Sequence, residues 1–204
     1  MIQWTIQAAK SSGVIDLIVV TSDDCDVIQI SKKSEVLTID RPSELASDSA
    51  TTFDVVLHAL TEINRLNYKP KKIMLLQPTS PLRSAVDIVG VFNALNLKSA
   101  DGIVTVCKVD HPIQWCNVLP KDKSMKNFLK KQFLDLRSQD FEINYRLNGA
   151  IYFSTIKSFL KNSGFMGGST FAYEMPRERS VDIDEEYDYW VSKALVVEMG
   201  VACE

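Results

Sequence analysis

Two aspartates spaced two residues apart carry the most specific chemistry that the residue types suggest. Asp182 and Asp184 lie in the alternating segment 180–184. In an extended segment, residues i and i+2 point to the same side, so both carboxylates would face one point. Such a pair suits a hard cation such as Mg²⁺, which proteins hold with one or two carboxylates plus substrate phosphates. The alternative is that one aspartate caps the helix that begins near Glu185 and the other is solvated.

A second candidate is the glutamine that opens the stretch QPTSPLR at 77–83. The amide of Gln77 can both donate and accept hydrogen bonds, which suits a sugar or the edge of a base. The alternative is a proline-rich turn in which Ser80 caps the next helix.

A third candidate region is the stretch RLNG at 146–149, ahead of the apolar run 150–153. Arg146 could clamp a carboxylate or phosphate, and Gly149 could let a ligand approach the backbone closely. The alternative is an arginine paired with an acid, followed by a turn glycine. Tyr152 and Phe165 could line an apolar pocket, or they could simply pack in the core.

The elements that must position these residues alternate between strands and helices. Buried strands are predicted at 17–20, 73–76, 103–106 and 150–153, and helices at 2–11, 26–33, from Thr51 or Thr52 onward, 85–97, 156–160 and 185–199. This alternation predicts an α/β fold, a mostly parallel sheet with helices on both faces. Ligands bind beyond the carboxyl ends of the strands in such sheets. The segment 111–145 has weak periodicity and is predicted to be an insertion.

Composition limits the class of protein. The chain has 204 residues, 46% hydrophobic and 24% charged, as expected of one globular domain. A net charge of −3 argues against a dedicated nucleic-acid binder. No apolar run long enough for a membrane span and no secretory leader is visible, so we expect a cytoplasmic protein with neither nucleic acid nor a membrane as partner. Free thiols are expected for the four cysteines, Cys25, Cys107, Cys116 and Cys203.

Taken together, these motifs resemble those of the N-acylneuraminate cytidylyltransferases, the enzymes that make CMP-sialic acid. The matching stretches are 20–24, 41–46, 76–83, 146–152 and 179–184, in the order of the family and over nearly the whole chain. The resemblance implies a Rossmann-like nucleotidyltransferase fold, with 1–204 as one domain.

The resemblance also implies a reaction and a set of roles. CMP would pass from CTP to the anomeric hydroxyl of N-acetylneuraminate, releasing pyrophosphate, with Mg²⁺ as cofactor. Asp182 and Asp184 would hold the metal, and Gln77 would act between nucleotide and sugar. Arg41 and Thr52 would bind the nucleotide, and the sugar would contact Arg146, Asn148, Tyr152 and Phe165. The insertion would make the protein a homodimer.

Two departures from the family pattern open alternatives. Met1 matches the start of the family's first helix, so the preceding strand and phosphate-binding loop have no counterpart; we expect an N-terminally incomplete domain that turns CTP over poorly. Ser138 stands where many members carry an arginine for the sugar carboxylate, and Arg137 is displaced by one residue. The sugar could therefore be legionaminate or pseudaminate, or the chain could be a catalytically silent dimeric binding module.

Overall fold

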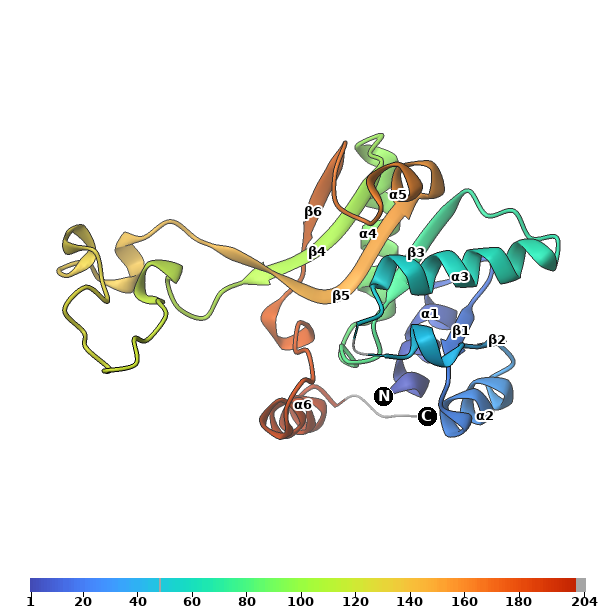
Figure 1. Ribbon diagram of the computed structural model, residues 1–204, viewed down its shortest axis with the longest axis horizontal. Coiled ribbons are helices and arrows are strands. Elements are labelled where there is room, and N and C mark those ends of the chain that lie inside the picture. The colour runs from blue at the N-terminus through green and yellow to red at the C-terminus, as the bar shows by residue number, and fades with distance from the viewer. Residues whose placement is uncertain (48, 201–204) are drawn as a thin grey trace.

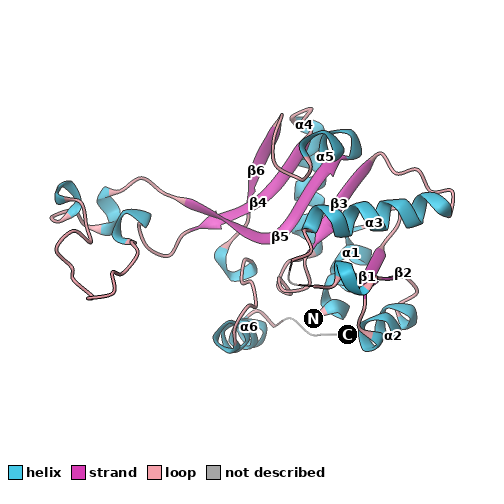
Figure 2. Cartoon of the chain, in the orientation of Figure 1, coloured by secondary structure: helices cyan, strands magenta, loops and turns pink. Residues whose placement is uncertain are grey.

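The computed structural model describes residues 1–47 and 49–200. Within these ranges, helices and strands follow one another in the order α1 (Ile2–Ser12), β1 (Val19–Ser22), α2 (Cys25–Lys33), β2 (Leu37–Asp40), α3 (Thr52–Arg65), β3 (Lys72–Leu76), α4 (Ala85–Leu97), β4 (Gly102–Lys108), β5 (Tyr145–Thr155), α5 (Ile156–Asn162), β6 (Thr170–Glu174) and α6 (Glu186–Glu198). The bounds of α4 are those that the sequence predicts, whereas the pattern assigned no element to β2 or β6. The predicted α/β class is confirmed (Figure 2).

The strands form two sheets. β1 and β2 pair in parallel, and the second sheet has the order β3-β5-β4-β6. In that sheet β5 runs antiparallel to both neighbours, while β4 and β6 are parallel. The strands other than β5 therefore share one direction in the larger sheet, as the strand–helix alternation predicts.

Helices cover both faces of the larger sheet, as predicted. On one face, Ile88 and Val91 of α4 and Ala9 of α1 pack with Ile103 and Ile151 of the sheet. The opposite core contains residues of α3 and α5, namely Val56, Leu60, Ile63 and Phe159, packed with Val104 and Tyr152. Neighbouring strand residues such as 103 and 104 thus enter opposite cores, as the pleat requires. Figure 1 shows α3 and α5 in front of the sheet and α4 behind it.

An irregularity in β5 interrupts its pairing with β4. Val104 pairs with Tyr152 and Val106 with Leu147, so residues 148–151 of β5 lie opposite Thr105 alone. The Thr105 hydroxyl accepts a hydrogen bond from the Ile151 amide at 2.9 Å and donates to the Ile151 carbonyl at 3.1 Å. A bulge of this kind bends a strand and redirects its side chains. It also places Gly149, whose φ is +74°, at the point where β5 turns.

The segment 111–144 leaves the body of the protein as an arm, and Figure 1 shows it projecting away from the sheet. Short 3₁₀ turns at Ile113–Trp115, Lys131–Phe133 and Ser138–Asp140 are its regular structure. The Phe141 ring contacts Trp115 and Phe133, with centroid distances of 5.6 and 5.7 Å. Large apolar side chains of the arm remain exposed, among them Ile113, Val118, Leu119, Met125, Leu134 and Ile143.

Candidate active site

Four of the predicted site residues line one cavity of about 330 Å³: Thr52, Gln77, Tyr152 and Phe165. They come from the start of α3, the end of β3, the middle of β5 and the loop after α5. The remaining lining residues are Thr51, Phe53, Leu75, Phe159, Ser163, Gly164 and Met166, so no charged residue lines it. We call it the aromatic cavity.

Aromatic rings stiffen one wall of this cavity. Phe165 is 8% exposed and lies 5.7 Å from the Tyr152 ring and 4.9 Å from the Phe159 ring, measured between centroids. Phe159 in turn stacks on Phe53 at 5.2 Å. Phe165 is therefore both part of the core and a surface of the cavity, which joins the two interpretations of its sequence position.

The start of α3 forms another part of the wall. The Thr51 hydroxyl caps the helix by accepting a hydrogen bond from the Asp54 amide at 3.1 Å, which fixes Thr52 in the first turn. Amides at a helix N-terminus favour anionic or polar ligands. Thr52 lines the cavity beside these amides, and its contact with a nucleotide stays a prediction.

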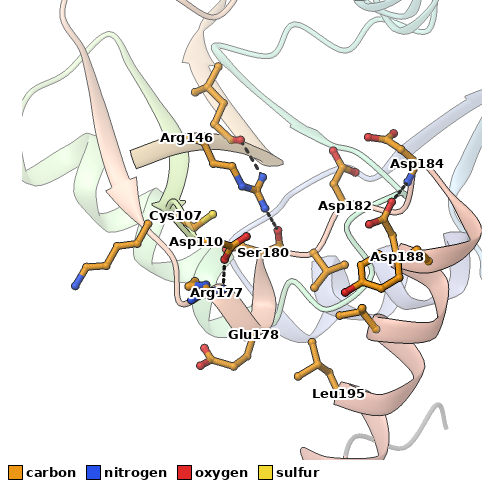
Figure 3. A pocket seen from close by; sticks show the side chains of 15 residues that line it. Cys107, Asp110, Arg146, Arg177, Glu178, Ser180, Asp182, Asp184, Asp188 and Leu195 are labelled. Carbon is orange, nitrogen blue, oxygen red and sulfur yellow. Dashed lines mark hydrogen bonds and ion pairs between the residues drawn. The ribbon is translucent and has the colours of Figure 1, made fainter. Parts of the chain in front are cut away.

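Asp182, Asp184 and Arg146 line a second, larger cavity of about 740 Å³ beside α6 (Figure 3). Charged residues of both signs surround it: Lys108, Asp110, Arg146, Arg177, Glu178, Asp182, Asp184 and Asp188. Because carboxylates outnumber the cations, we call it the acidic cavity. Asp110 and Arg177 form an ion pair at its rim.

The two aspartates reach this cavity from a loop and not from a strand. Residues 180–184 belong to neither sheet, so no neighbouring strand pairs with them in the described structure. The Ile183 amide instead donates to the Thr79 carbonyl at 2.8 Å, which ties the segment to the loop after β3. Asp188 accepts from the amides of Asp184 and Glu185 at the start of α6, so the alternative in which Asp182 or Asp184 caps this helix is wrong.

Gly149 lines neither cavity, but one side chain from each approaches it. A Cβ atom placed there would lie 2.8 Å from Asp182 Oδ2 and 3.0 Å from Gln77 Oε1. Both side chains therefore rest against the bare backbone of the bulge, one from each cavity. Only glycine combines the positive φ with the space that these two groups occupy. The groups that approach this backbone are side chains of the protein itself, and the approach of a ligand to Gly149 stays a prediction.

The pKa of Tyr152 links the cavities electrostatically. Burial of the phenol raises its pKa above the ordinary value of 10.0, and the negative charge of Asp182 raises it further. The Tyr152 hydroxyl therefore stays protonated at neutral pH and can donate a hydrogen bond.

Asp182 fits a divalent cation. Its Oδ1 atom is buried and has no hydrogen-bond partner among the described residues, while Asp184 is exposed to solvent. Carboxylate oxygens are the ligands that hard cations prefer. Within 1–47 and 49–200, no group of three His, Cys, Asp or Glu side chains is placed to hold a metal. Asp182 and Asp184 would therefore share an ion with oxygens of substrate or water.

Two expected sugar ligands have different surroundings. The Asn148 side chain is 1% exposed, and its amide donates to Ser180 Oγ at 2.9 Å and accepts from the Ala150 amide at 3.2 Å. These contacts hold the bulge together, so the expectation of a sugar contact for Asn148 is wrong in this structure. Arg146 is exposed in the acidic cavity, where its Nη2 donates to the Ser180 carbonyl at 3.2 Å. A cation at this position remains free to meet an anionic group with its other donors.

Arg41 lies apart from both cavities, at the carboxyl end of β2. Its Nη2 donates to the Thr21 carbonyl at 2.9 Å, and its own amide donates to the Ser22 carbonyl at 2.9 Å. Arg41 therefore bridges the ends of β1 and β2, and it is not brought together with Thr52 in the aromatic cavity.

Arg137, the arm residue next to the position expected to bind a sugar carboxylate, is paired with an acid. Arg137 forms a two-point ion pair with Asp140, with Nε and Nη2 at 3.1 and 2.9 Å from the carboxylate oxygens. Its hydrogen bonds to Asp140 raise the pKa of Arg137. Arg137 is thus paired with Asp140 within the arm.

A buried arginine missing from the predicted site fixes the loop of Gln77. Arg83 is 2% exposed and donates to the carbonyls of Gln77 and Ala150 at 3.1 and 2.8 Å, and to Thr5 Oγ1 at 2.9 Å. Burial lowers the pKa of Arg83 to about 10, against an opposing effect of Asp87. Arg83 stays charged at neutral pH and ties the residue after β3 to Ala150 of β5, next to Gly149. The helix after this loop is capped by Ser84, and the proposed cap Ser80 is wrong.

Two solved structures share this fold. A CMP-2-keto-3-deoxy-manno-octonic acid synthetase complexed with CTP matches with a TM-score of 0.67 at 12% identity, over 97% of this chain and 88% of the other. A 4-diphosphocytidyl-2C-methyl-D-erythritol synthase from Anaerococcus prevotii matches with a TM-score of 0.59 at 13% identity, over the same shares.

The chain belongs to the cytidylyltransferase family, whose sequence profile matches residues 1–196. N-acylneuraminate cytidylyltransferases of Escherichia coli O18:K1:H7 and Streptococcus agalactiae serotype III are 29% and 30% identical over 93% of this chain. The chain spans 44–45% of the length of these two relatives. A pseudaminic acid cytidylyltransferase of Campylobacter jejuni serotype O:2 is 26% identical over 96% of this chain and 84% of its own length.

Two general expectations can also be compared with the structure. No helix among the described residues is long and apolar enough to span a membrane. Cys25, Cys107 and Cys116 are free thiols, as predicted, and Cys203 lies outside the described residues.

Proposed function

We propose that this chain transfers CMP from CTP to the anomeric hydroxyl of N-acetylneuraminate, giving CMP-sialic acid. The sugar oxygen forms a bond to the α-phosphorus, the bond to the β-phosphate bridging oxygen breaks, pyrophosphate leaves, and the hydroxyl proton passes to solvent. The observation that carries the proposal is the convergence of Gln77 and Asp182 on Gly149, between an uncharged cavity and an acidic one. The relatives named for sialic acid support the choice of sugar.

The aromatic cavity suits the uncharged parts of the substrates. Its aromatic rings and the Thr52 hydroxyl can contact either the base and ribose of cytidine or the N-acyl group of the sugar. Gln77 at its inner end can donate one hydrogen bond and accept another, which orients the sugar hydroxyl toward the phosphate. The protonated Tyr152 adds a donor on the same wall.

Asp182 and Asp184 would hold Mg²⁺ at the edge of the acidic cavity, with the buried Oδ1 of Asp182 as the preferred ligand atom. A magnesium ion bound there would neutralise phosphate charge and favour the ionised sugar hydroxyl. Arg146 lies in the same cavity and can meet a phosphate or carboxylate.

A second candidate keeps the reaction and replaces the sugar by pseudaminate or legionaminate. Arg137 is engaged by Asp140, so the arm offers no free arginine at that position for the carboxylate of sialic acid. The similarity to a pseudaminic acid cytidylyltransferase supports the same alternative.

A cytoplasmic location forms part of both proposals.

The test is pyrophosphate release by the purified protein with CTP, Mg²⁺ and each of the three sugar acids in turn. We expect release with CTP and at least one acid, and none when UTP or ATP replaces CTP. Turnover by this chain alone is expected to be slow, because its sequence has no Gly- and Lys-rich loop ahead of a helix. Failure to bind CTP and to release pyrophosphate with any of the acids would overturn the proposal and favour a silent module.

We also propose that the arm joins two copies into a homodimer. Val118 and Leu134 are 87% and 60% exposed at its surface, which suits burial against a partner. The double variant Val118→Asp/Leu134→Asp is expected to halve the mass measured by sedimentation equilibrium. A monomeric wild type would contradict this proposal.

A further inference from the structure

A buried carboxylate that lines neither cavity accepts hydrogen bonds from two residues, Ser84 and Arg179. Asp87 is 0% exposed and sits in the first turn of α4, where its Oδ2 accepts from the Ser84 amide at 2.9 Å and the Ser84 hydroxyl at 2.8 Å. Arg179 completes the set with two further bonds of 2.8 Å, from Nε to Oδ2 and from Nη2 to Oδ1. A two-point pair of this geometry fixes both partners in orientation as well as distance.

This ion pair anchors the start of the segment that carries the aspartates. Ser180, directly after Arg179, is 1% exposed, accepts from Asn148 Nδ2 at 2.9 Å and donates to the Pro176 carbonyl at 2.7 Å. Three residues further on, the Ile183 amide donates to the Thr79 carbonyl at 2.8 Å. The segment is thus tied to α4, to β5 and to the loop after β3 within five residues, 179–183.

Asp182 lies between these tethers, with its Oδ2 against Gly149 and its buried Oδ1 without a partner among the described residues. An unpaired buried carboxylate oxygen is unfavourable, so the backbone must be held to keep it there. Asp87 and Arg179 line neither cavity and so act only through the segment.

We propose that the buried Asp87–Arg179 ion pair positions Asp182 for cation binding, which makes Asp87 and Arg179 positioning residues of the transfer reaction. This inference rests on the proposed function for the role of the cation. Its structural half, that the pair holds residues 180–183 in place, stands on the contacts alone.

The test compares Arg179→Ala, Arg179→Lys and Asp87→Asn with the wild type. Arg65→Ala is the matched control, because Arg65 forms an exposed ion pair with Glu62 at 2.7 Å on α3. Two quantities are measured on folded protein: hydrogen exchange of the Ile183 amide, and the Kd of Mn²⁺ in the presence of CTP by electron paramagnetic resonance. Arg179→Lys and Asp87→Asn keep the size of the site should Arg179→Ala fail to fold.

In Arg179→Ala and Asp87→Asn we expect the Ile183 amide to exchange at least tenfold faster and the Kd of Mn²⁺ to rise about tenfold. Losses of metal affinity on this scale are typical when a residue that orients a metal ligand is replaced. Arg179→Lys should recover part of both, and Arg65→Ala should change neither. If both quantities stay within twofold of wild type, or if exchange rises while Mn²⁺ affinity does not, positioning is overturned. A wild type that binds no Mn²⁺ with CTP would instead overturn the proposed function, and the two failures are thereby distinguished.

Discussion

The two cavities differ in chemistry although a residue of each, Asp182 and Gln77, approaches the same glycine. No charged residue lines the aromatic cavity, whereas charged side chains of both signs surround the acidic cavity. The uncharged, aromatic wall of the first cavity suits a base or an acyl group. The carboxylates of the second suit a divalent cation that also binds substrate phosphates. Asp182 of the acidic cavity and Gln77 of the aromatic cavity both approach Gly149, and under the proposed function a nucleotide phosphate would face a sugar hydroxyl there. The contrast indicates that the uncharged parts of a substrate and its charged groups would bind on different sides of the bulged strand β5.

The cavities also differ in how they are held. Phe159 and Phe165 of the aromatic cavity belong to the hydrophobic core, so packing fixes that wall. Asp182 sits on a loop outside both sheets, held by Ile183 and by the residues before it. Substitutions in the aromatic cavity are therefore expected to change substrate affinity. Substitutions that loosen the loop of Asp182 are expected to change the dependence of turnover on Mg²⁺.

The largest effect is expected for Asp182→Asn. Loss of the carboxylate charge should lower turnover about a hundredfold or more, because a bound metal supplies several kcal/mol to such transfers. Steady-state pyrophosphate release at varied Mg²⁺ measures it. Asp16→Asn removes an exposed carboxylate that lines neither cavity and serves as control. Turnover within threefold of wild type in Asp182→Asn would remove Asp182 from the reaction.

A substitution at Gly149 should displace residues of both cavities, Asp182 and Gln77. Gly149→Ala places a Cβ against Asp182 and Gln77, so we expect turnover to fall about tenfold. Gly13→Ala is the matched control, since Gly13 has a φ of +64° with no atom within 4 Å of its Cβ position. Both variants should lose about 1 kcal/mol of stability from the left-handed conformation. Equal turnover in the two would show that space at Gly149 has no catalytic role.

A smaller effect is expected inside the aromatic cavity. Met166 lines it and is 54% exposed, so Met166→Ala should leave folding intact. Loss of its contact area should raise the KM of CTP or of the sugar acid a few-fold, about 1 kcal/mol, at unchanged Mg²⁺ dependence. A shifted Mg²⁺ dependence with unchanged KM values would contradict the division between the cavities.

The smallest effect concerns stability at high pH. The pKa of Tyr152 is raised in the folded protein, so the folded state keeps the proton that the unfolded chain loses near pH 10. The contribution of Tyr152 is complete below pH 10 and declines as pH rises through its folded pKa. Urea unfolding at pH 9 and pH 11 should show a smaller loss of stability in Tyr152→Phe than in wild type. An equal loss would place Tyr152 in an ordinary solvated environment.

Local patterns were sufficient for much of this architecture. The span of α4 follows from its apolar content and its flanking Ser84 and Lys98. Thr52, Gln77, Tyr152 and Phe165, which line one cavity, were named as site residues through the family resemblance and not through a shared sheet edge. β2 and β6 were not predicted, because each is short and many of their residues are only partly buried, which leaves a weak apolar signal.

The side-chain roles that the sequence did not reveal depend on contacts between distant segments. Asn148 points inward because β5 bulges opposite Thr105, and nothing local to Asn148 signals that register shift. Asp87 looks like an ordinary residue of a helix N-terminus, and Arg179 lies 92 positions away from it in the chain. Only the tertiary fold brings such partners together.

The most direct test of this account is the position of a bound cation relative to Gly149. In isotopically labelled protein with CTP, substoichiometric Mn²⁺ should broaden the amide resonance of Gly149 and those of residues 181–184, and Asp182→Asn should abolish the broadening. Sharp resonances at Gly149 and 181–184, with broadening confined to amides elsewhere in the chain, would contradict a transfer centre beside Gly149.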